Sequence, residues 1–307
     1  MPTVLLLALT AAEVIGKVAS KACSNVIAAK SSRIKYFIYL IIVGIVACGV
    51  LFALNGFKIS CNARTLLYAL VYSAICSVIA VCGLEILKYA NIAGVLVLSS
   101  LGSLISSALV GAFIFHEDIS PKTLIKMGIM FIPAVLTFIE TKRSGKFSDK
   151  KQKGGVLLKL ALILLVLITV RCANNVLLKF YKMDSGVTDI SSMFIFTNVF
   201  QALTSLVALI VCIIRKRSTP ELRAELADAK SIIRLLPILA IIASTSTSNV
   251  VSLISAELIG LMDISIYTPT VSALGMISGV IASFIYRERH GIFFYLSAAF
   301  AVIAVII

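Results

Sequence analysis

The chain has 307 residues, of which 60% are hydrophobic and 14% are charged. Because soluble globular domains contain about 25% charged residues, this composition excludes an ordinary soluble domain and predicts an integral membrane protein with several membrane-spanning helices. The net charge of +14 is better explained by basic residues in short loops between apolar runs, as the positive-inside rule describes, than by nucleic-acid binding.

Five apolar stretches in the first half of the chain are predicted to be membrane-spanning helices. A helix needs about 20 residues to cross the hydrocarbon layer. The predicted helices cover residues 3–28, 36–54, 65–88, 89–118 and 121–140. Asn55 and Gly56 form a turn signal after the second helix, and Pro121 supplies the fixed φ that favours the start of the fifth. Residues 141–155 are polar and basic, which is typical of a linker.

Five further helices are predicted after this linker, at residues 156–181, 189–214, 231–257, 261–289 and 291–307. The segment between the second and the third of these contains Ser218, with Glu221 three positions later. This spacing is the pattern of a capping box at a helix start. We therefore expect a short surface helix in this segment, lying at the cytoplasmic interface of the membrane.

Two stretches of the same build indicate an internal repeat. Residues 89–118 and 261–289 both hold small residues in the middle and aromatic residues near the end, and they close on Glu117 and Glu288, which are 171 positions apart. The sequence therefore predicts an all-α integral membrane fold with ten transmembrane helices in two five-helix repeats. Because each repeat has an odd number of helices, the two repeats are expected to be inverted relative to one another.

The predicted domains follow from this repeat. The first repeat is residues 1–143, the second is residues 155–307, and residues 144–154 form a basic cytoplasmic linker. The closing glutamates Glu117 and Glu288 are expected to cap a helix or to bond backbone across a loop. Glu85 and Glu257, near the ends of the preceding apolar helices, are expected to be solvated charges.

Charged side chains inside the helices are the candidates for a functional site. Glu13 and Lys17 lie four residues apart, as do Arg171 and Asn175 at an offset of 158 positions, so each pair shares one helical face. Glu13 and Arg171 are predicted near the middle of a hydrocarbon layer about 30 Å thick. A charge at that depth costs at least about 2.5–3.5 kcal/mol, so it persists when it is paired or lines a wet cavity.

Two interpretations of these charges stay open. They form a substrate or proton site, as in transporters with midplane sites between inverted repeats, or Glu13 pairs with Lys17 or Arg171 and only holds helices together. Lys21 and Lys179 lie closer to helix ends, where snorkelling to the interface is the favoured interpretation.

A solid polar run from Ser244 to Asn249 cannot all face lipid. It either forms hydrogen bonds between helices or provides one wall of a cavity. The predicted substrate or coupling residues are Glu13, Lys17, Arg171, Asn174 and Asn175, and the predicted cavity-lining residues are Tyr72, Ser100, Ser103, Ser248, Asn249 and Tyr267.

The motif G-A-F-I-F-H-E-D-I-S-P at residues 111–121 and its weaker echo A-S-F-I-Y-R-E-R at 282–289 resemble the drug/metabolite transporter superfamily, specifically its two-domain EamA-type members. Lys21 and Lys179, late in the first helix of each half, match the same pattern. The resemblance implies secondary transport along a pathway lined by the first, third, fourth, sixth, eighth and ninth helices. Two features depart from it: the chain has no tryptophan, and its loop charges place the termini outside, whereas many relatives are drawn with cytoplasmic termini.

We expect a secondary active transporter in the cell membrane, an exporter that moves a small polar or zwitterionic metabolite by alternating access. A site with both charge signs suits a zwitterion. The alternatives are proton-coupled efflux of organic cations or drugs, a membrane-embedded enzyme, and a non-transporting receptor or scaffold. No metalloprotease, serine-hydrolase or P-loop motif is present, so no enzyme activity is expected.

The expected partners are the small-molecule substrate, the lipid bilayer and protons as a coupling ion. No nucleic acid, cofactor, metal ion or catalytic residue is expected, and the chain is expected to be a monomer or a homodimer. The seven cysteines form no C-x-x-C pair that would indicate a metal site.

The loop charges predict how the chain crosses the membrane. Loops on one side hold 18 basic residues and loops on the other hold 5, so the richer side should be cytoplasmic and both termini extracytoplasmic. A reporter fused after Ile307 should therefore read as extracytoplasmic, and a tag in the 146–153 linker as cytoplasmic. A cytoplasmic signal from the reporter after Ile307 would reverse this orientation.

Overall fold

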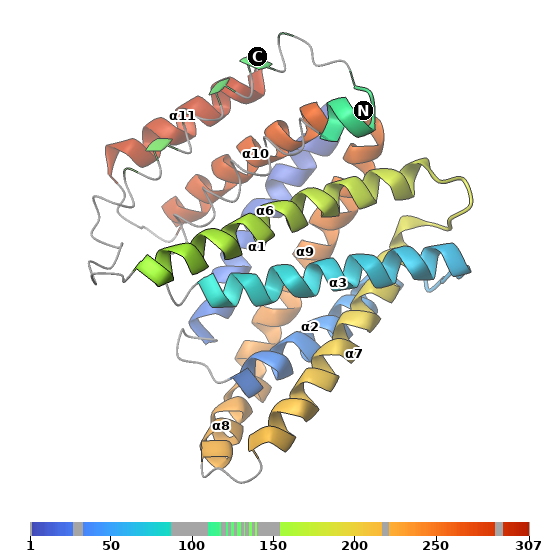
Figure 1. Cartoon of the computed structure of the whole chain (residues 1–307), viewed down its shortest axis with the longest axis vertical. Coiled ribbons are helices and arrows are strands. Elements are labelled where there is room, and N and C mark those ends of the chain that lie inside the picture. Colours follow the sequence, from blue (N-terminus) through green and yellow to red (C-terminus); the bar gives the residue numbers. More distant parts are fainter. Residues whose placement is uncertain are drawn as a thin grey trace. The chain divides into compact units, whose positions relative to one another are not determined.

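The computed structural model describes residues 2–26, 33–86, 110–117, 154–216, 221–285 and 291–306, together with single residues and pairs between 121 and 139. Across these described residues the backbone is helical apart from short turns and loops, and contains no strand. The helices are α1 (Pro2–Val26), α2 (Arg33–Leu54), α3 (Ala63–Ile86), α6 (Gly154–Met183), α7 (Ile190–Lys216), α8 (Glu221–Ala229), α9 (Leu235–Leu261), α10 (Ile264–Ile285) and α11 (Ile292–Ile306), with a 3-10 turn, η1 (Lys230–Ile233), before α9 (Figure 1).

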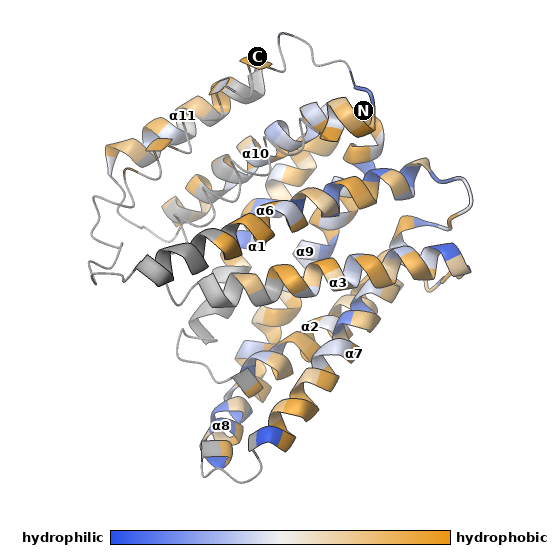
Figure 2. Ribbon diagram, in the orientation of Figure 1, coloured by the Kyte–Doolittle hydropathy of each residue, from blue (hydrophilic) through white to orange (hydrophobic). Residues whose placement is uncertain are grey.

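Four of these helices are long and apolar enough to cross a membrane. The apolar spans are Ile34–Leu54 in α2, Ile190–Arg215 in α7, Leu235–Leu261 in α9 and Ile264–Ala282 in α10, and the ribbon in Figure 2 shows hydrophobic residues along α2 and α7. Helices suit such sequences because they satisfy all interior backbone groups without water. The prediction of a helical membrane protein is thus confirmed at this level. The arrangement as ten helices in two inverted repeats stays a prediction.

Most predicted helix bounds lie within a few residues of the observed ones, and the start of α9 shows why they differ. The sequence predicted a helix from residue 231, whereas the structure has the 3-10 turn there and begins α9 at Leu235. Pro237 lies in the first turn of α9. Proline has no N–H and blocks the preceding turn, so it is tolerated near a helix start and not further inside.

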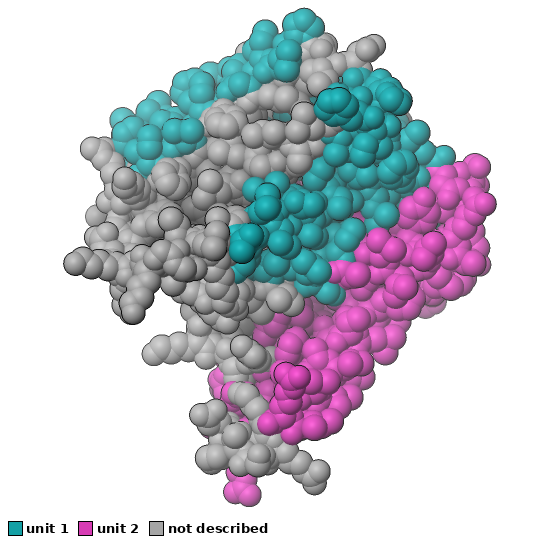
Figure 3. All heavy atoms as spheres, viewed as in Figure 1, with its two compact units in different colours: residues 1–6, 75–183, 256–307 teal, residues 7–74, 184–255 magenta. Residues whose placement is uncertain are grey.

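The chain divides into two compact units (Figure 3). Unit 1 comprises Met1–Leu6, Ile75–Met183 and Ala256–Ile307, and unit 2 comprises Leu7–Ala74 and Asp184–Ser255. Each unit takes segments from both halves of the sequence, and α1, α3 and α9 each contribute residues to both. The compact units are therefore not the two predicted repeats, which concern similarity along the sequence and stay a prediction.

In unit 2, α2 packs along α7. A Cβ atom added at Gly44 of α2 would lie 2.9 Å from the Ala202 Cβ and 3.1 Å from the Asn198 carbonyl oxygen of α7, so the two backbones approach closely at this glycine. One turn further along α2, the Cys48 thiol donates to the Ile195 carbonyl at 3.5 Å. Close approach at small residues is how membrane helices gain contact when lipid supplies no hydrophobic driving force.

The short helix α8 and η1 are fixed to α2 within the same unit. Ile232 of η1 is fully buried and clusters with Ile241 of α9, against partly buried Tyr39, Ile42 and Val43 of α2. The Lys35 ammonium pairs with the Asp228 carboxylate at 3.0 Å. A short helix was predicted in this segment, and α8 provides it. Ser218, the predicted N-cap, lies outside the described residues.

The close approach at Gly44 generates a prediction about stability. Gly44→Ala should destabilise the protein by about 1–3 kcal/mol, because the new methyl group overpacks the contact with α7. Gly49→Ala in the same helix is the matched control, since a Cβ there meets no heavy atom within 4 Å. That control should stabilise by about 0.5–1 kcal/mol through helix propensity alone.

Thermal unfolding of the two variants in the same detergent measures the difference. Equal shifts of the melting temperature in the same direction would show that α2 and α7 do not pack closely at Gly44.

Candidate functional site

The charged stripe of α1 lies in unit 2. The Lys17 ammonium is 3.5 Å from the Glu13 carboxylate, and the Glu13 side chain is 15% exposed while that of Lys17 is 38% exposed. The four-residue spacing places both groups on one helical face, as predicted. The Glu13–Lys17 pair left open by the sequence therefore forms. The side chain of Lys21 lies outside the described residues.

The polar run of α9 is close to this stripe. A Cβ atom at Gly16, beside Glu13 and Lys17 on α1, would lie 3.4 Å from the Thr247 methyl group of α9. The Thr247 hydroxyl donates to the Ala243 carbonyl at 2.7 Å. Within unit 2, the charged stripe of α1 thus lies next to the hydroxyl-bearing face of α9.

The remaining members of that run divide between two environments. Asn249 is buried, and its side-chain amide donates to the Ala47 carbonyl of α2 at 3.3 Å. This bond is of the interhelical kind that the sequence left open as one alternative. The Ser246 hydroxyl donates to its own helix, at the Ile242 carbonyl, and Ser248 is exposed. Ser248 is therefore the more accessible of the two residues that the sequence assigned to a cavity wall here.

Tyr72 of α3, a predicted cavity-lining residue, is buried in unit 2. Its ring meets that of Phe194 on α7 edge to face, with centroids 5.6 Å apart. Such aromatic pairs add about 0.5–1.5 kcal/mol beyond burial of their area. Tyr72 therefore joins α3 to α7.

The polar stripe of α6 lies in unit 1. Arg171, Asn174 and Asn175 are half-buried there, and Arg171 and Asn175 share a face with Lys179. No ion pair to Arg171 is formed within the part of unit 1 that the structure describes. Tyr267 is buried in the first turn of α10, where its N–H donates to the Asp263 carbonyl at 2.8 Å.

Several predicted residues lie outside the described residues. They are Ser100 and Ser103 in the fourth predicted helix and Glu288 in the echo motif at 282–289. Among the residues that the structure does describe, no three His, Cys, Asp or Glu side chains gather as a metal site would require.

Glu117 caps the N-terminus of α10 in unit 1. One carboxylate oxygen accepts the Ile264 N–H at 2.8 Å, and the other accepts the Ser265 N–H at 3.0 Å. The Lys179 ammonium of α6 also donates to this carboxylate. The Glu117 side chain is 4% exposed and that of Lys179 is 13% exposed. The predicted capping role of Glu117 is thus confirmed. The prediction that Lys179 snorkels is wrong, because its charge is paired inside the protein.

The motif around Glu117 explains how the carboxylate reaches that position. After a helical segment at residues 110–114, His116 adopts a left-handed conformation with φ of 51°, and the Glu117 N–H donates to the Gly111 carbonyl at 3.0 Å. A Cβ at Gly111 would lie 2.5 Å from a Glu117 carboxylate oxygen. Glycine at position 111 therefore leaves the space that the carboxylate occupies.

Phe115 completes this arrangement. Its ring lies 5.0 Å from that of Phe180 on α6, and the Lys179 ammonium lies 5.0 Å from the Phe115 ring centre. A cation over an aromatic face is attracted by the ring quadrupole. Gly111, Phe115 and Glu117 of the motif at residues 111–121 thus each have a structural role.

The charge on Glu117 follows from its contacts. Burial would raise the pKa of this carboxyl, but the Lys179 ammonium and the backbone N–H groups of Ser265 and Ile264 outweigh it and hold the pKa below its ordinary value. Glu117 is therefore ionised at neutral pH, and its negative charge meets the positive end of the α10 dipole.

A second ion pair lies one turn further along α6. The Lys182 ammonium donates to the Glu257 carboxylate of α9, which is 51% exposed. Lys179 also lies 3.9 Å from the Asp263 carboxylate. Glu257 keeps the solvent exposure that the sequence predicted, but its partner was missed. The signal available was the i, i+3 spacing of Lys179 and Lys182, which places both bases on one side of α6.

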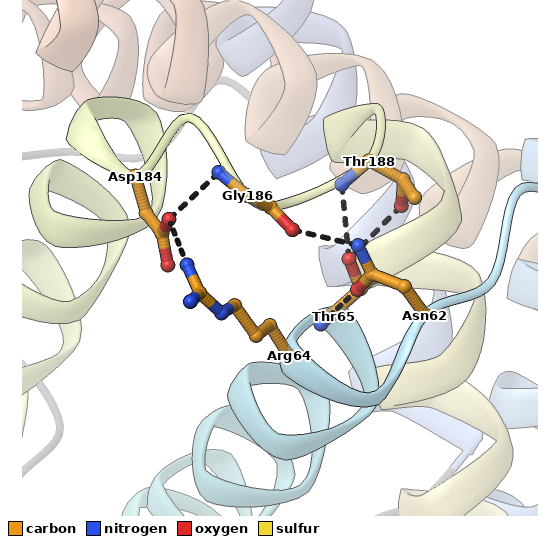
Figure 4. A network of polar contacts seen from close by, with 6 residues as sticks. All are labelled: Asn62, Arg64, Thr65, Asp184, Gly186 and Thr188. Carbon is orange, nitrogen blue, oxygen red and sulfur yellow. Dashed lines mark hydrogen bonds and ion pairs between the residues drawn. The ribbon is translucent and has the colours of Figure 1, made fainter.

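In unit 2, a polar cluster joins the loop before α3 to the loop before α7 (Figure 4). The Asn62 amide donates to the Gly186 carbonyl at 2.7 Å, and its oxygen accepts the Thr65 N–H at 2.7 Å as the N-cap of α3. Arg64 pairs with Asp184 at 3.1 Å, and the Thr188 N–H donates to the Thr65 hydroxyl at 3.0 Å. These bonds connect residues 62–65, at the start of α3, to residues 184–188 in the loop before α7.

Asp189 caps α7 in the same cluster of loops. Its carboxylate accepts the Ser192 N–H and hydroxyl, both at 2.9 Å, and the Asn55 amide at 3.1 Å. Burial would raise the pKa of Asp189, but the bonds from Ser192 and Ser60 lower it overall. Asn62 and Asp189 were not predicted to be caps, although Asn or Asp directly before an apolar run is a recognised start signal.

No protein-family model matches this sequence, and no protein of curated function matches it. The chain is similar in fold to a protein of known crystal structure, with a TM-score of 0.63 and 11% sequence identity over 99% of this chain and 95% of that chain. At this identity the likeness concerns the fold alone.

The Glu117 cluster generates a prediction about stability. Glu117→Gln should lower the free energy of unfolding by about 3 kcal/mol, because it leaves the buried Lys179 ammonium without its counter-charge. The matched control is Glu257→Gln, whose half-exposed pair should cost less than about 1 kcal/mol. The double variant Glu117→Gln/Lys179→Met should recover part of the loss.

The stabilisation should also depend on pH. Because folding lowers the pKa of Glu117, its contribution is complete above the ordinary carboxyl pKa and is lost as the pH falls through the lowered value. Melting curves of the wild type and Glu117→Gln should therefore converge in acid. A constant difference across that range would contradict the assignment.

Proposed function

We propose that this protein is a secondary active transporter that exports a small polar or zwitterionic metabolite across the cell membrane by alternating access. The observation that carries this proposal is the placement of charged side chains on α1 and α6. These helices have 25 and 30 residues, similar to or longer than the four apolar spans of 19 to 27 residues, but they carry three and four acidic or basic residues.

Charges at such positions need a reason to persist. A membrane protein that needed α1 and α6 only for packing would be more stable with apolar residues there, since each buried charge costs free energy on insertion. Glu13 and Lys17 offset part of this cost by pairing. Among the residues that the structure describes, no such pairing accounts for Arg171, which a water-filled pathway or an anionic substrate group would.

The chemistry of the residues supports a zwitterionic substrate. The Arg171 guanidinium suits a carboxylate, because its planar fork can donate two parallel hydrogen bonds. The carboxylate of Glu13 suits an ammonium group, for which Lys17 would be a competitor. Asn175, on the same face of α6 as Arg171, adds an uncharged donor and acceptor.

Transport in proteoliposomes with an imposed pH gradient tests the proposal. The wild type should transport a zwitterionic metabolite from a panel, and Arg171→Ala should raise the apparent KM by about 10-fold or more, the loss expected for one charge-assisted pair. Glu13→Gln should abolish the response to the pH gradient while the protein stays folded. Glu257→Gln is the control for loss of an exposed acid.

Other outcomes would favour other functions. If Glu13 and Arg171 are only structural, the double variant Glu13→Gln/Arg171→Gln should keep normal proton-coupled transport, and this result would refute the assignment. Transport of lipophilic cations alone would favour drug efflux. Chemical conversion of a substrate without transport would favour an enzyme.

A further inference from the structure

Four exposed basic side chains lie in the stretch where α7, α8, η1 and α9 follow one another in unit 2. They are Arg215 at the end of α7, Arg223 in α8, Lys230 in η1 and Arg234 directly before α9. We call this set the basic collar. Residues 215–234 hold six basic and three acidic residues in all. In Figure 2 the hydrophilic end of α7 lies beside the hydrophilic helix α8, and contacts between the two helices agree with this view.

The collar is held in a fixed orientation. Ala229 and Ile232 are 2% and 0% exposed, so the connection between α8 and α9 is anchored by burial. The Asp228 carboxylate is paired with Lys35, whose side chain is only 8% exposed. Lys35, a base outside the segment, therefore neutralises one of its three acidic residues. The net positive charge around the collar is larger than the count of six basic and three acidic residues gives.

Large apolar side chains are exposed directly beside the collar. Ile233, Leu235 and Leu236 are 61%, 76% and 77% exposed. Leu235 is also the first residue of the apolar span of α9, and Arg215 is the last residue of the apolar span of α7. The collar thus lies at the boundary where two membrane-spanning segments meet the headgroup region.

We propose that the basic collar binds anionic phospholipid headgroups, with Ile233 and Leu236 in the acyl region beside them. Arginine guanidinium groups bind phosphate through paired hydrogen bonds, and basic residues at a membrane surface attract anionic lipid. An acidic soluble protein or a nucleic acid would match the charge but not the exposed apolar side chains. The ligand chemistry is therefore a phosphate group attached to a hydrocarbon chain.

The absence of tryptophan from the sequence permits a direct test. An indole introduced by Ile233→Trp is a single fluorescent reporter beside the collar, and brominated lipids quench it on contact. The full-length protein is reconstituted in two bilayers with the same proportions of phosphatidylcholine and phosphatidylglycerol. In one bilayer only the phosphatidylglycerol is brominated, and in the other only the phosphatidylcholine.

Brominated phosphatidylglycerol should quench the reporter as if its local mole fraction were roughly threefold above the bulk value. This enrichment is smaller than the one that a single basic residue would cause if salt did not screen its charge. The triple variant Arg223→Gln/Lys230→Gln/Arg234→Gln should remove this preference. A reporter introduced by Leu203→Trp, at an exposed position of the α7 span, controls for general lipid contact and should respond to both lipids in proportion to their amounts.

Three results would overturn the proposal. Equal quenching at position 233 after correction for lipid proportions would show no anionic preference, and a preference that survives in the triple variant would place it elsewhere. Absence of quenching by either lipid would show that the collar does not touch the bilayer. Unchanged quenching at position 203 in the triple variant shows that the variant is folded, and no readout depends on transport.

Discussion

The hydrocarbon layer offers no hydrogen-bond partners, so each polar group in a membrane-spanning helix has to be satisfied by the protein itself. In unit 2 this requirement is met in several ways. The Ser246 and Thr247 hydroxyls donate to carbonyls of their own helix, and the Asn249 amide donates to a carbonyl of α2. Glu13 pairs with Lys17 one turn away. The polar residues that first indicate a functional site in the sequence are thus also residues that hold helices together.

The same requirement separates two kinds of charge in unit 1. Glu117 has a complete set of partners, namely two backbone N–H groups and the Lys179 ammonium. A carboxylate with all its partners inside the protein has little to offer a substrate, so this cluster sets the position of the α10 N-terminus. Arg171 lies two turns before Lys179, on the same face of α6. Arg171 has no ion pair among the described residues, and this contrast is why the proposed substrate site includes Arg171 and excludes Glu117.

Within the described residues the sequence predicted the helices well, because apolar length is a local property. It predicted their ends less well, because an end depends on single residues such as Pro237. The i, i+4 spacing placed Glu13 and Lys17 on one face for the same local reason. The partners of Lys179 and Asn249 were not predictable in this way. Glu117 is 62 positions from Lys179, and Ala47 is 202 positions from Asn249. Such contacts arise from the fold, and no spacing in one sequence encodes them.

The chain passes between the two units at four points, three of them inside α1, α3 and α9 and the fourth between Met183 and Asp184. At this fourth point polar bonds hold the chain on both sides. Lys182 is paired with Glu257 in unit 1, and Asp184 is paired with Arg64 in unit 2. Gly186 adds a bond to Asn62, and its lack of a side chain leaves room for the Arg64 guanidinium. The polar groups on each side of this crossing are therefore satisfied within their own unit.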